Sequence, residues 1–162
     1  MKKLTLDSTD RRILNLLQAK SDMTLKEIAK AVNLSTTPCW KRIQQLQDSG
    51  IIRASVALLD AHKVNLDLTV FVAVRTSEHN IEWSDKFTQI VQTFPEITEV
   101  YRMSGEIDYM LKVVVEDTRA YDAFYKRLIK QISLSDINSM FAMEEMKYTT
   151  ALPISVLPNE EQ

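Results

Sequence analysis

Two helical segments joined by a very short turn constrain this chain more than any other feature of its sequence. The tetrad Thr24-Leu25-Lys26-Glu27 has the spacing of a capping box, in which the threonine and the glutamate satisfy each other's backbone amides. The segment Ser35–Gly50 begins with hydroxyl residues suited to capping, has Pro38 in its first turn and ends at a glycine. Only Asn33-Leu34 lies between them. So short a connection forces a sharp angle between two helices, which predicts a helix-turn-helix.

The segment Ser35–Gly50 has one apolar side and one polar side. Cys39, Ile43 and Leu46 recur at helical spacing and predict a buried seam. The other positions carry groups that hydrogen-bond to phosphates or base edges, namely Ser35, Thr36, Thr37, Lys41, Arg42 and Gln45. Taken alone, the segment fits either a DNA recognition helix or a plain surface helix, so its surroundings must decide.

The surroundings favour DNA. Residues 1–64 contain 11 Lys/Arg and 6 Asp/Glu, whereas residues 65–162 contain 9 and 16. A basic first third is a candidate for binding a polyanion, with chance variation between solvated surfaces as the alternative. A further helix is expected over Leu6–Ala19, capped by Asp7. Residues 51–59 are rich in β-branched and apolar side chains and predict a strand, either a short wing or a connector.

The remainder of the chain predicts a second domain. Its expected order is strand 68–76, helix 82–94, strands 97–103 and 109–115 around a turn with Gly105, a helix capped by Thr118, and strand 137–147. This β-α-β-β-α-β order is the ferredoxin-like arrangement, with two helices on one face of an antiparallel sheet. The other face carries Tyr101, Met103, Met110, Met140 and Met143, which predicts burial in a homodimer.

The expected fold class is therefore α+β, a winged helix-turn-helix domain followed by a ferredoxin-like domain. We predict domain limits of 1–59 and 68–162, with a linker at 60–67. The absence of a long apolar run or an N-terminal leader pattern predicts a soluble cytoplasmic protein that spans no membrane.

No residue pattern points to catalysis. His62 and His79 stand alone, without metal-ligand spacing or an acid–base partner. Cys39 is the only cysteine and falls on the apolar seam, where a small buried side chain is expected. Glycine-rich phosphate loops and nucleophile elbows are absent from the sequence. We therefore expect neither an enzyme nor a cofactor.

The chain resembles the Lrp/AsnC, or feast/famine, family of regulators. The resemblance rests on LDSTDRRILNLLQ and LKEIAKAVNLSTTPCWKRIQQLQDSGII in the first half. In the second half it rests on GEIDYML, FYKRL and FAMEEMKYTTALPI, so it covers nearly the whole chain. Within the family, TTPCWKR is similar to a DecR-like proteobacterial branch. Trp40 departs from the aliphatic residue found there in many relatives, and it is expected either to pack on the first helix or to lie against the DNA backbone, with packing favoured.

The resemblance implies a dimer, often assembled into an octamer, that binds operator DNA and a small effector, usually an amino acid. Carried over, the effector site would include Gly105, Glu106, Asp108, Tyr109, Thr149 and Thr150. A glycine lets backbone amides approach a ligand carboxylate, and an acidic side chain can pair with an α-ammonium group. On the DNA side, Lys41 and Arg42 are expected mainly to hold phosphates. The rival hypothesis is an architectural protein that bends or compacts DNA with little ligand control.

Overall fold

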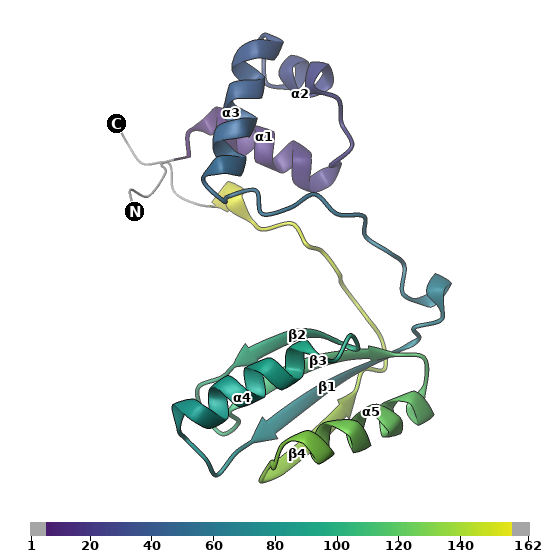
Figure 1. Ribbon diagram of the computed structural model, residues 1–162. Helices are drawn as coiled ribbons and strands as arrows, with labels where there is room; N and C mark the ends of the chain where they lie inside the picture. Colours follow the sequence, from purple (N-terminus) through teal and green to yellow (C-terminus); the bar gives the residue numbers. More distant parts are fainter. Residues whose placement is uncertain (1–5, 157–162) are drawn as a thin grey trace. The chain divides into compact units, whose positions relative to one another are not determined.

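The structure is a computed structural model that describes residues 6–156 (Figure 1). The chain separates into two compact units, the first formed by residues up to Leu58 together with those from Lys147 onward, and the second by Leu59–Met146. Each unit has its own hydrophobic core. The units are therefore described one at a time.

The first unit has three helices, α1 (Ser8–Ala19), α2 (Leu25–Ala31) and α3 (Thr36–Asp48). Asp7 caps α1 and forms a reciprocal capping box with Asp10, as the sequence predicts for the cap. The predicted box of Thr24 and Glu27 also forms at the start of α2. Two of the three helices, α1 and α2, thus begin at a capping box whose side chains accept hydrogen bonds from free backbone N–H groups.

The connection between α2 and α3 is a tight turn. Asn33 takes the left-handed conformation with φ 59°, which asparagine adopts more readily than most side chains. Leu34 then donates its backbone N–H to the carbonyl of Ala29 at 2.9 Å. The turn brings α3 against α2, and the seam residues Cys39 and Leu46 become fully buried beside Ile13 of α1. The predicted helix-turn-helix and its apolar seam are confirmed.

The strand predicted over residues 51–59 does not form. Gly50 ends α3 with φ 75°, and the residues that follow pair with no strand in the described chain. Val56, Leu58 and Leu59 are exposed. A β-branched sequence becomes a strand only where a partner completes its hydrogen bonds, and none is supplied here.

The C-terminal segment belongs with the helical unit, which differs from the predicted domain of 68–162. Leu152 accepts a hydrogen bond from the Gln18 amide at 3.3 Å and donates its own N–H to Gln18 Oε1 at 2.6 Å. Ile154, in the short helix η2 (Ile154–Val156), packs against the core of this unit. The composition of these residues carries no sign of this long-range contact.

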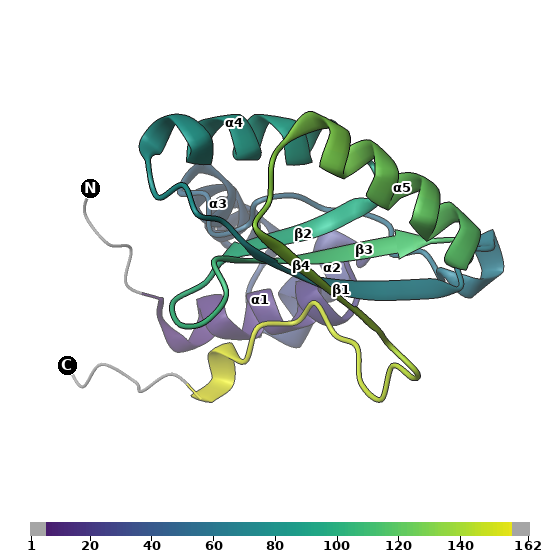
Figure 2. The ribbon, with the colours of Figure 1, turned by 90° about the horizontal axis from the view of Figure 1, so that it is seen from below.

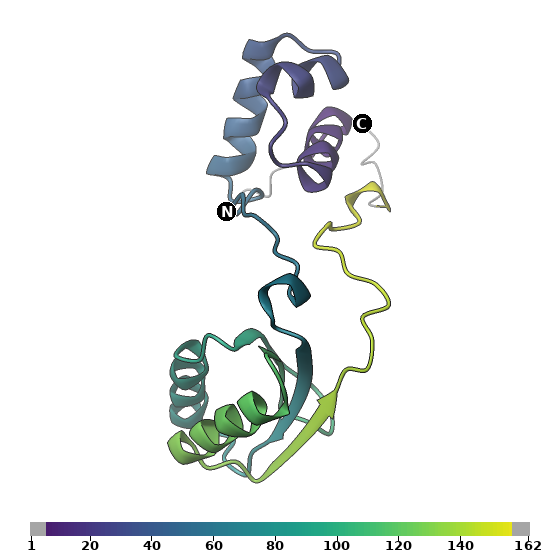
Figure 3. The same ribbon diagram turned by 90° about the vertical axis from the view of Figure 1, so that its right-hand side faces the viewer.

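The second unit has the predicted β-α-β-β-α-β order. A short helix, η1 (His62–Val64), precedes β1 (Leu68–Arg75), α4 (Ile81–Gln92), β2 (Ile97–Arg102), β3 (Tyr109–Val115), α5 (Thr118–Gln131) and β4 (Asp136–Phe141). The sheet is antiparallel with the order β2-β3-β1-β4. Figures 2 and 3 show α4 and α5 on the same face of this sheet.

Two predicted boundaries in this unit are wrong. Asp117, rather than Thr118, caps α5, because its carboxylate accepts hydrogen bonds from Arg119 N and Ala120 N at 2.8 Å each. The last strand ends at Phe141, where its pairing with β1 stops, rather than at the predicted Lys147. Apolar residues beyond that point, such as Met143, are exposed instead of paired.

The helix-covered face of the sheet buries an aromatic core, whereas the opposite face is open. Phe87 and Phe124 are fully buried between the helices and the strands. On the open face, the register places Phe71 of β1 between Lys112 and Met140 on the neighbouring strands. Phe71, Tyr101 and Met140 are exposed there, and of these the sequence predicts Tyr101 and Met140 on this face.

Candidate DNA-binding helix and effector loop

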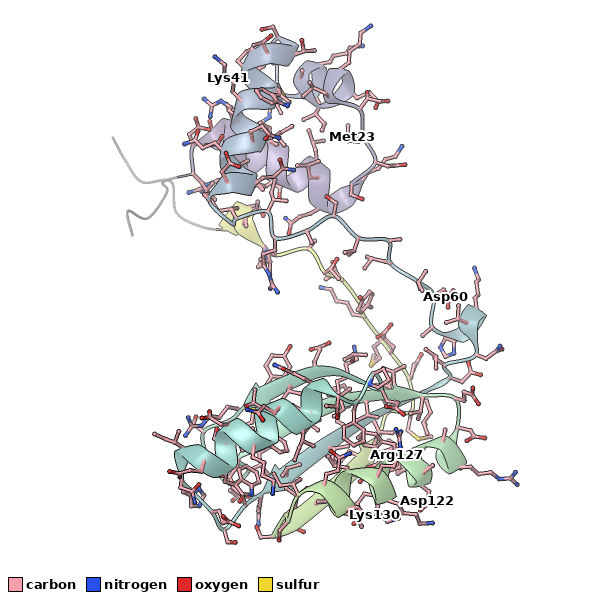
Figure 4. All side chains as sticks on the ribbon, viewed as in Figure 1. Met23, Lys41, Asp60, Asp122, Arg127 and Lys130 are labelled. Carbon is pink, nitrogen blue, oxygen red and sulfur yellow. The ribbon has the colours of Figure 1, made fainter. Side chains whose placement is uncertain are left out.

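The solvent-facing side of α3 has the polar side chains that its sequence predicts. Cys39 and Leu46 fix the buried side, so residues half a helical turn away must face solvent. The exposed positions are Ser35, Thr36, Thr37, Lys41 and Gln45. Figure 4 shows Lys41 extending from α3 away from α2, and within the described residues it forms no ion pair. This surface combines hydroxyls, an amide and a cation, which are the donors that contact DNA.

Ser35 occupies the capping position of α3, but its hydroxyl makes no cap hydrogen bond. The expectation that hydroxyl residues cap this helix through their side chains is therefore wrong for Ser35. Pro38 lacks an N–H, so the amides left at this end belong to Thr36 and Thr37. Uncapped helix amides are suited to a phosphate group, because the helix dipole adds partial positive charge there.

Arg42 is held within the helical unit by the capping box of α1. Its Nη1 donates to Asp7 Oδ2 at 2.6 Å and to Asp10 Oδ1 at 2.7 Å. The other oxygens of the same carboxylates complete the box, since Asp7 Oδ1 accepts Asp10 N at 2.7 Å and Asp10 Oδ2 accepts Asp7 N at 3.3 Å. One guanidinium thus joins the start of α1 to the middle of α3. Its two neighbours in the site, Lys41 and Gln45, have no such anchor in the described structure.

The electrostatics of this cluster are reciprocal. Burial acts to raise the pKa of Asp7, but the backbone N–H of Asp10 and the Arg42 guanidinium outweigh it and hold that pKa below its ordinary value. The hydrogen bonds from Arg42 to Asp10 and Asp7 raise the pKa of the guanidinium in turn. From the sequence, Asp7 is expected only as a helix cap. The separation of Asp7 and Asp10 from Arg42 by more than thirty residues hides this pairing.

Trp40 does not pack into the core of the helical unit, contrary to the preferred expectation. Its side chain is 50% exposed, and it is not among the residues packed on the core. Cys39 beside it is fully buried, and burial raises the pKa of its thiol. The thiol is therefore a small buried apolar group, as its position on the seam predicts.

In the second unit, the loop between β2 and β3 is built around Gly105 and Asp108. Gly105 has a backbone φ of 124°, which residues other than glycine rarely adopt because of their Cβ atom. Asp108 Oδ2 accepts the N–H of Thr76 at 2.8 Å, while Asp108 N donates to the carbonyl of Val74 at 3.0 Å. The loop is thereby fixed to the end of β1, and Asp108 already has a structural partner.

Charged side chains from β1 and from the segment after it surround this loop. Arg75 Nη2 lies 3.7 Å from Glu106 Oε2, and His79 Nδ1 lies 3.8 Å from Asp108 Oδ1. Arg75, Thr76 and His79 are not predicted as neighbours of the loop from the sequence, because only the β1–β3 pairing brings them there. His62, the other histidine, donates from Nδ1 to Asp67 Oδ1 at 2.7 Å, and this hydrogen bond raises the pKa of the imidazole.

Three residues of the predicted effector site, Tyr109, Thr149 and Thr150, are not part of the loop itself. Tyr109 faces the helix-covered side, where it is 8% exposed, lies 4.6 Å from the Phe87 ring and donates to Ser84 Oγ at 3.2 Å. Its side chain belongs to the core of the second unit, and its assignment to the effector site stays a prediction. Thr149 and Thr150 belong to the segment that joins the helical unit, and Thr149 Oγ1 accepts the N–H of Ala151 at 3.1 Å.

Two hollows on the second unit, of about 260 and 440 Å³, share Ile132 and Ser133 at the end of α5. In residues 6–156 no cluster of three or more His, Cys, Asp or Glu side chains is arranged to hold a metal ion. No helix in that range is both long and apolar enough to cross a bilayer.

Together, the two units define a class of protein. A helix-turn-helix with an exposed polar and cationic second helix is a DNA-binding module, and here it is followed by a ferredoxin-like domain with a glycine loop and an open sheet face. Comparison with known proteins agrees with both parts. Residues 6–53 match the profile described as winged helix-turn-helix DNA-binding, and residues 69–152 match the Lrp/AsnC ligand binding domain.

Relatives match over almost their whole length. The DNA-binding transcriptional activator DecR of Escherichia coli (strain K12) is 50% identical over 92% of this chain and 99% of its own. The glutamate uptake regulatory protein of Zymomonas mobilis is 44% identical over 92% of this chain and 91% of its own.

Solved structures have the same fold. An AsnC family transcriptional regulator from Agrobacterium tumefaciens superposes with a TM-score of 0.90 at 55% identity, covering 93% of this chain and 98% of that one. A transcriptional regulator from Neisseria meningitidis, solved as a complex with L-Met, gives 0.88 at 36% identity, covering 93% and 97%. The chain belongs to the Lrp/AsnC family of DNA-binding transcriptional regulators, as its motifs predict.

Proposed function

We propose that this protein is a sequence-specific transcriptional regulator whose binding to an operator responds to an amino acid. The observation that carries the proposal is the exposed side of α3, where Thr36, Thr37, Lys41 and Gln45 face solvent while the seam is buried. The recognition helix of a helix-turn-helix presents its N-terminal residues to the major groove. We infer that these exposed residues enter the groove.

The structure supports a division of labour on α3. Lys41 binds a phosphate, while Ser35, Thr36, Thr37 and Gln45 approach base edges or the sugar-phosphate backbone. Arg42 acts differently, because its Nη1 is occupied by Asp7 and Asp10. It positions α3 against α1 instead of holding a phosphate.

The effector is an amino acid bound at the loop of Gly105. The Neisseria neighbour was solved with L-Met, and the matching domain is described as ligand binding. Backbone amides beside Gly105 can meet the carboxylate of a ligand, and Glu106 or Asp108 can meet its ammonium group. The family resemblance assigns Thr149 and Thr150 to the effector site as well. Asp108 contributes through Oδ1, since its Oδ2 is bound to Thr76 N.

The assembly that presents α3 to DNA is a homodimer formed through the open face of the sheet, with dimers associating into an octamer. Phe71, Tyr101 and Met140 are exposed on that face, and large apolar patches on soluble domains mark interaction surfaces. A dimer would provide two recognition helices for a palindromic operator. Such a regulator works without catalysis, in the cytoplasm, where the chromosome is.

Two measurements test the proposal. A thermal-shift screen of the twenty amino acids should find a stabilising effector, because a ligand at a hundredfold its dissociation constant adds about 2.7 kcal/mol to the free energy of unfolding. Selection from a randomised duplex pool should enrich one sequence motif. DNA binding without enrichment, together with no thermal shift, would support an architectural protein instead.

A further inference from the structure

Trp40 is an exposed aromatic side chain on an otherwise polar helix surface. The chain has two tryptophans, and the other, Trp83, is only 6% exposed and donates its indole N–H to the carbonyl of Ser133 at 3.4 Å. Trp40 is 50% exposed. An indole has a large apolar surface whose burial is strongly favourable. A partner that covers the exposed Trp40 side chain would therefore gain binding free energy.

Trp40 lies on the flank of α3 that faces away from α1. At 100° per residue, it is about 160° around the helix from Arg42, which is held on α1. Thr37 and Gln44 lie one turn before and after it, and Lys41 follows it directly in the chain. The indole is therefore part of the same exposed surface as the proposed DNA contacts.

The residues around Trp40 indicate which kind of partner buries its side chain. An aromatic anchor in a protein–protein interface sits in a desolvated apolar setting, whereas Thr37, Lys41 and Gln44 are polar or charged. Hydroxyls, amides and a cation match phosphates and base edges. In the major groove the one apolar group on a base edge is the C5-methyl of thymine. A duplex with thymine at the right position would meet both the polar groups and the indole.

We propose that Trp40 is a specificity-determining residue that contacts a thymine methyl group in the major groove. The inference rests on the proposed function, because it requires α3 to enter the groove. It gives Trp40 a role that neither packing nor phosphate binding provides. It also accounts for an exposed indole among donors, since only a partner with both apolar and polar edges satisfies all of them.

The test uses the full-length protein and a duplex enriched from a randomised pool, with a scrambled duplex of equal composition for comparison. Each thymine of the enriched duplex is replaced in turn by deoxyuridine, which removes only the methyl group. At one position the wild type should lose roughly fourfold in affinity, the amount expected for one buried methyl. Trp40→Ala should show no loss at that position, while keeping the wild-type losses elsewhere.

A spectroscopic arm reports the contact directly. Trp83→Phe leaves Trp40 as the only tryptophan, and its emission should shift to shorter wavelength and resist acrylamide quenching when the enriched duplex binds. Should that variant fold poorly, the difference between wild type and Trp40→Phe gives the same signal. Trp40→Ala should also lower the ratio of specific to scrambled affinity roughly tenfold with an unchanged salt slope.

The outcomes separate the two claims. Equal deoxyuridine losses in wild type and Trp40→Ala, or Trp40 emission unmoved by a duplex that binds, overturns the role of Trp40 and leaves the regulator intact. A blue shift that follows protein concentration without DNA also overturns it, because a second copy then covers the indole. Equal affinity of the wild type for enriched and scrambled duplexes overturns sequence-specific binding, and with it this inference.

Discussion

The neighbouring cations Lys41 and Arg42 should respond in opposite ways to replacement by alanine. Arg42→Ala removes two hydrogen bonds from one guanidinium, at 2.6 Å to Asp7 and 2.7 Å to Asp10. It should therefore destabilise the helical unit without removing a phosphate contact. Lys41→Ala removes an exposed cation with no ion pair in the described structure, so it should weaken DNA binding and leave stability nearly unchanged.

The size of the Arg42 effect follows from its partial burial. A hydrogen bond to a charged partner contributes about 1.5–3 kcal/mol when buried, whereas an exposed ion pair contributes about 0.2–1 kcal/mol. The side chains of Arg42, Asp7 and Asp10 are 34%, 49% and 13% exposed, so the cluster lies between these cases. We expect a loss of about 2 kcal/mol, which for a domain of this size lowers Tm by about 10 °C.

Differential scanning calorimetry of the full-length variants measures the first effect. Fluorescence anisotropy with the enriched duplex, repeated over a range of salt concentrations, measures the second. Each lost phosphate contact lowers the salt slope by about 0.9. We expect that reduction for Lys41→Ala and an unchanged slope for Arg42→Ala, once both are compared under conditions where the variant is folded.

The reverse pattern would refute this reasoning. If Arg42→Ala lowers the salt slope by about one and leaves Tm unchanged, the guanidinium holds a phosphate and its contacts with α1 contribute little. An equal reduction of the salt slope in both variants would also exclude the positioning role of Arg42. A guanidinium that is bound to α1 makes no phosphate contact, so its removal should leave the slope unchanged.

Four further predictions concern acid stability, the loop of Gly105, the C-terminal segment and the open sheet face. Because the pKa of Asp7 is depressed, its stabilisation is complete above about pH 5 and is lost as pH falls through the folded pKa, so the Tm advantage of wild type over Arg42→Ala should shrink in acid. Asp108→Ala should abolish the thermal shift by the effector and also free Thr76 N, whereas Asp108→Asn keeps that hydrogen bond and should lose only the shift; calorimetry showing full binding to both would exclude Asp108. Gln18→Ala should cost about 1 kcal/mol and speed proteolysis of the segment at Leu152, and an unchanged cleavage rate would show that the contact is dispensable. Phe71→Asp on the open sheet face should convert the dimer to a monomer by light scattering, and an unchanged mass would place the interface elsewhere.

Local signals were sufficient to predict much of the fold. The capping box of Thr24 and the two-residue turn before Ser35 identify the helix-turn-helix, because both depend on residues close in sequence. The alternation along β1 and the helical seam of α4 likewise predict the order of the second unit. In each case the apolar pattern within the element itself identifies the face that is buried.

Contacts between distant residues account for much of what the sequence could not predict. A cation on a polar helix face looks like a phosphate ligand until Asp7 and Asp10 are brought to Arg42 by packing of α1 on α3. Tyr109 follows directly after the loop in sequence, but the alternation of β3 turns its side chain to the core. Trp40 was expected to pack on the first helix in preference to lying against the DNA backbone, yet its rotational position on α3 leaves it 50% exposed.

The central claim is that α3 reads sequence, and one competition measurement tests it most directly. Full-length protein bound to a labelled enriched duplex is displaced by unlabelled enriched or scrambled duplex at physiological salt, with and without the stabilising amino acid. We predict a preference of at least about a thousandfold for the enriched duplex, as specific DNA-binding proteins show, and a change in affinity when the amino acid is added. Equal displacement by both duplexes, unaffected by any amino acid, would contradict the account.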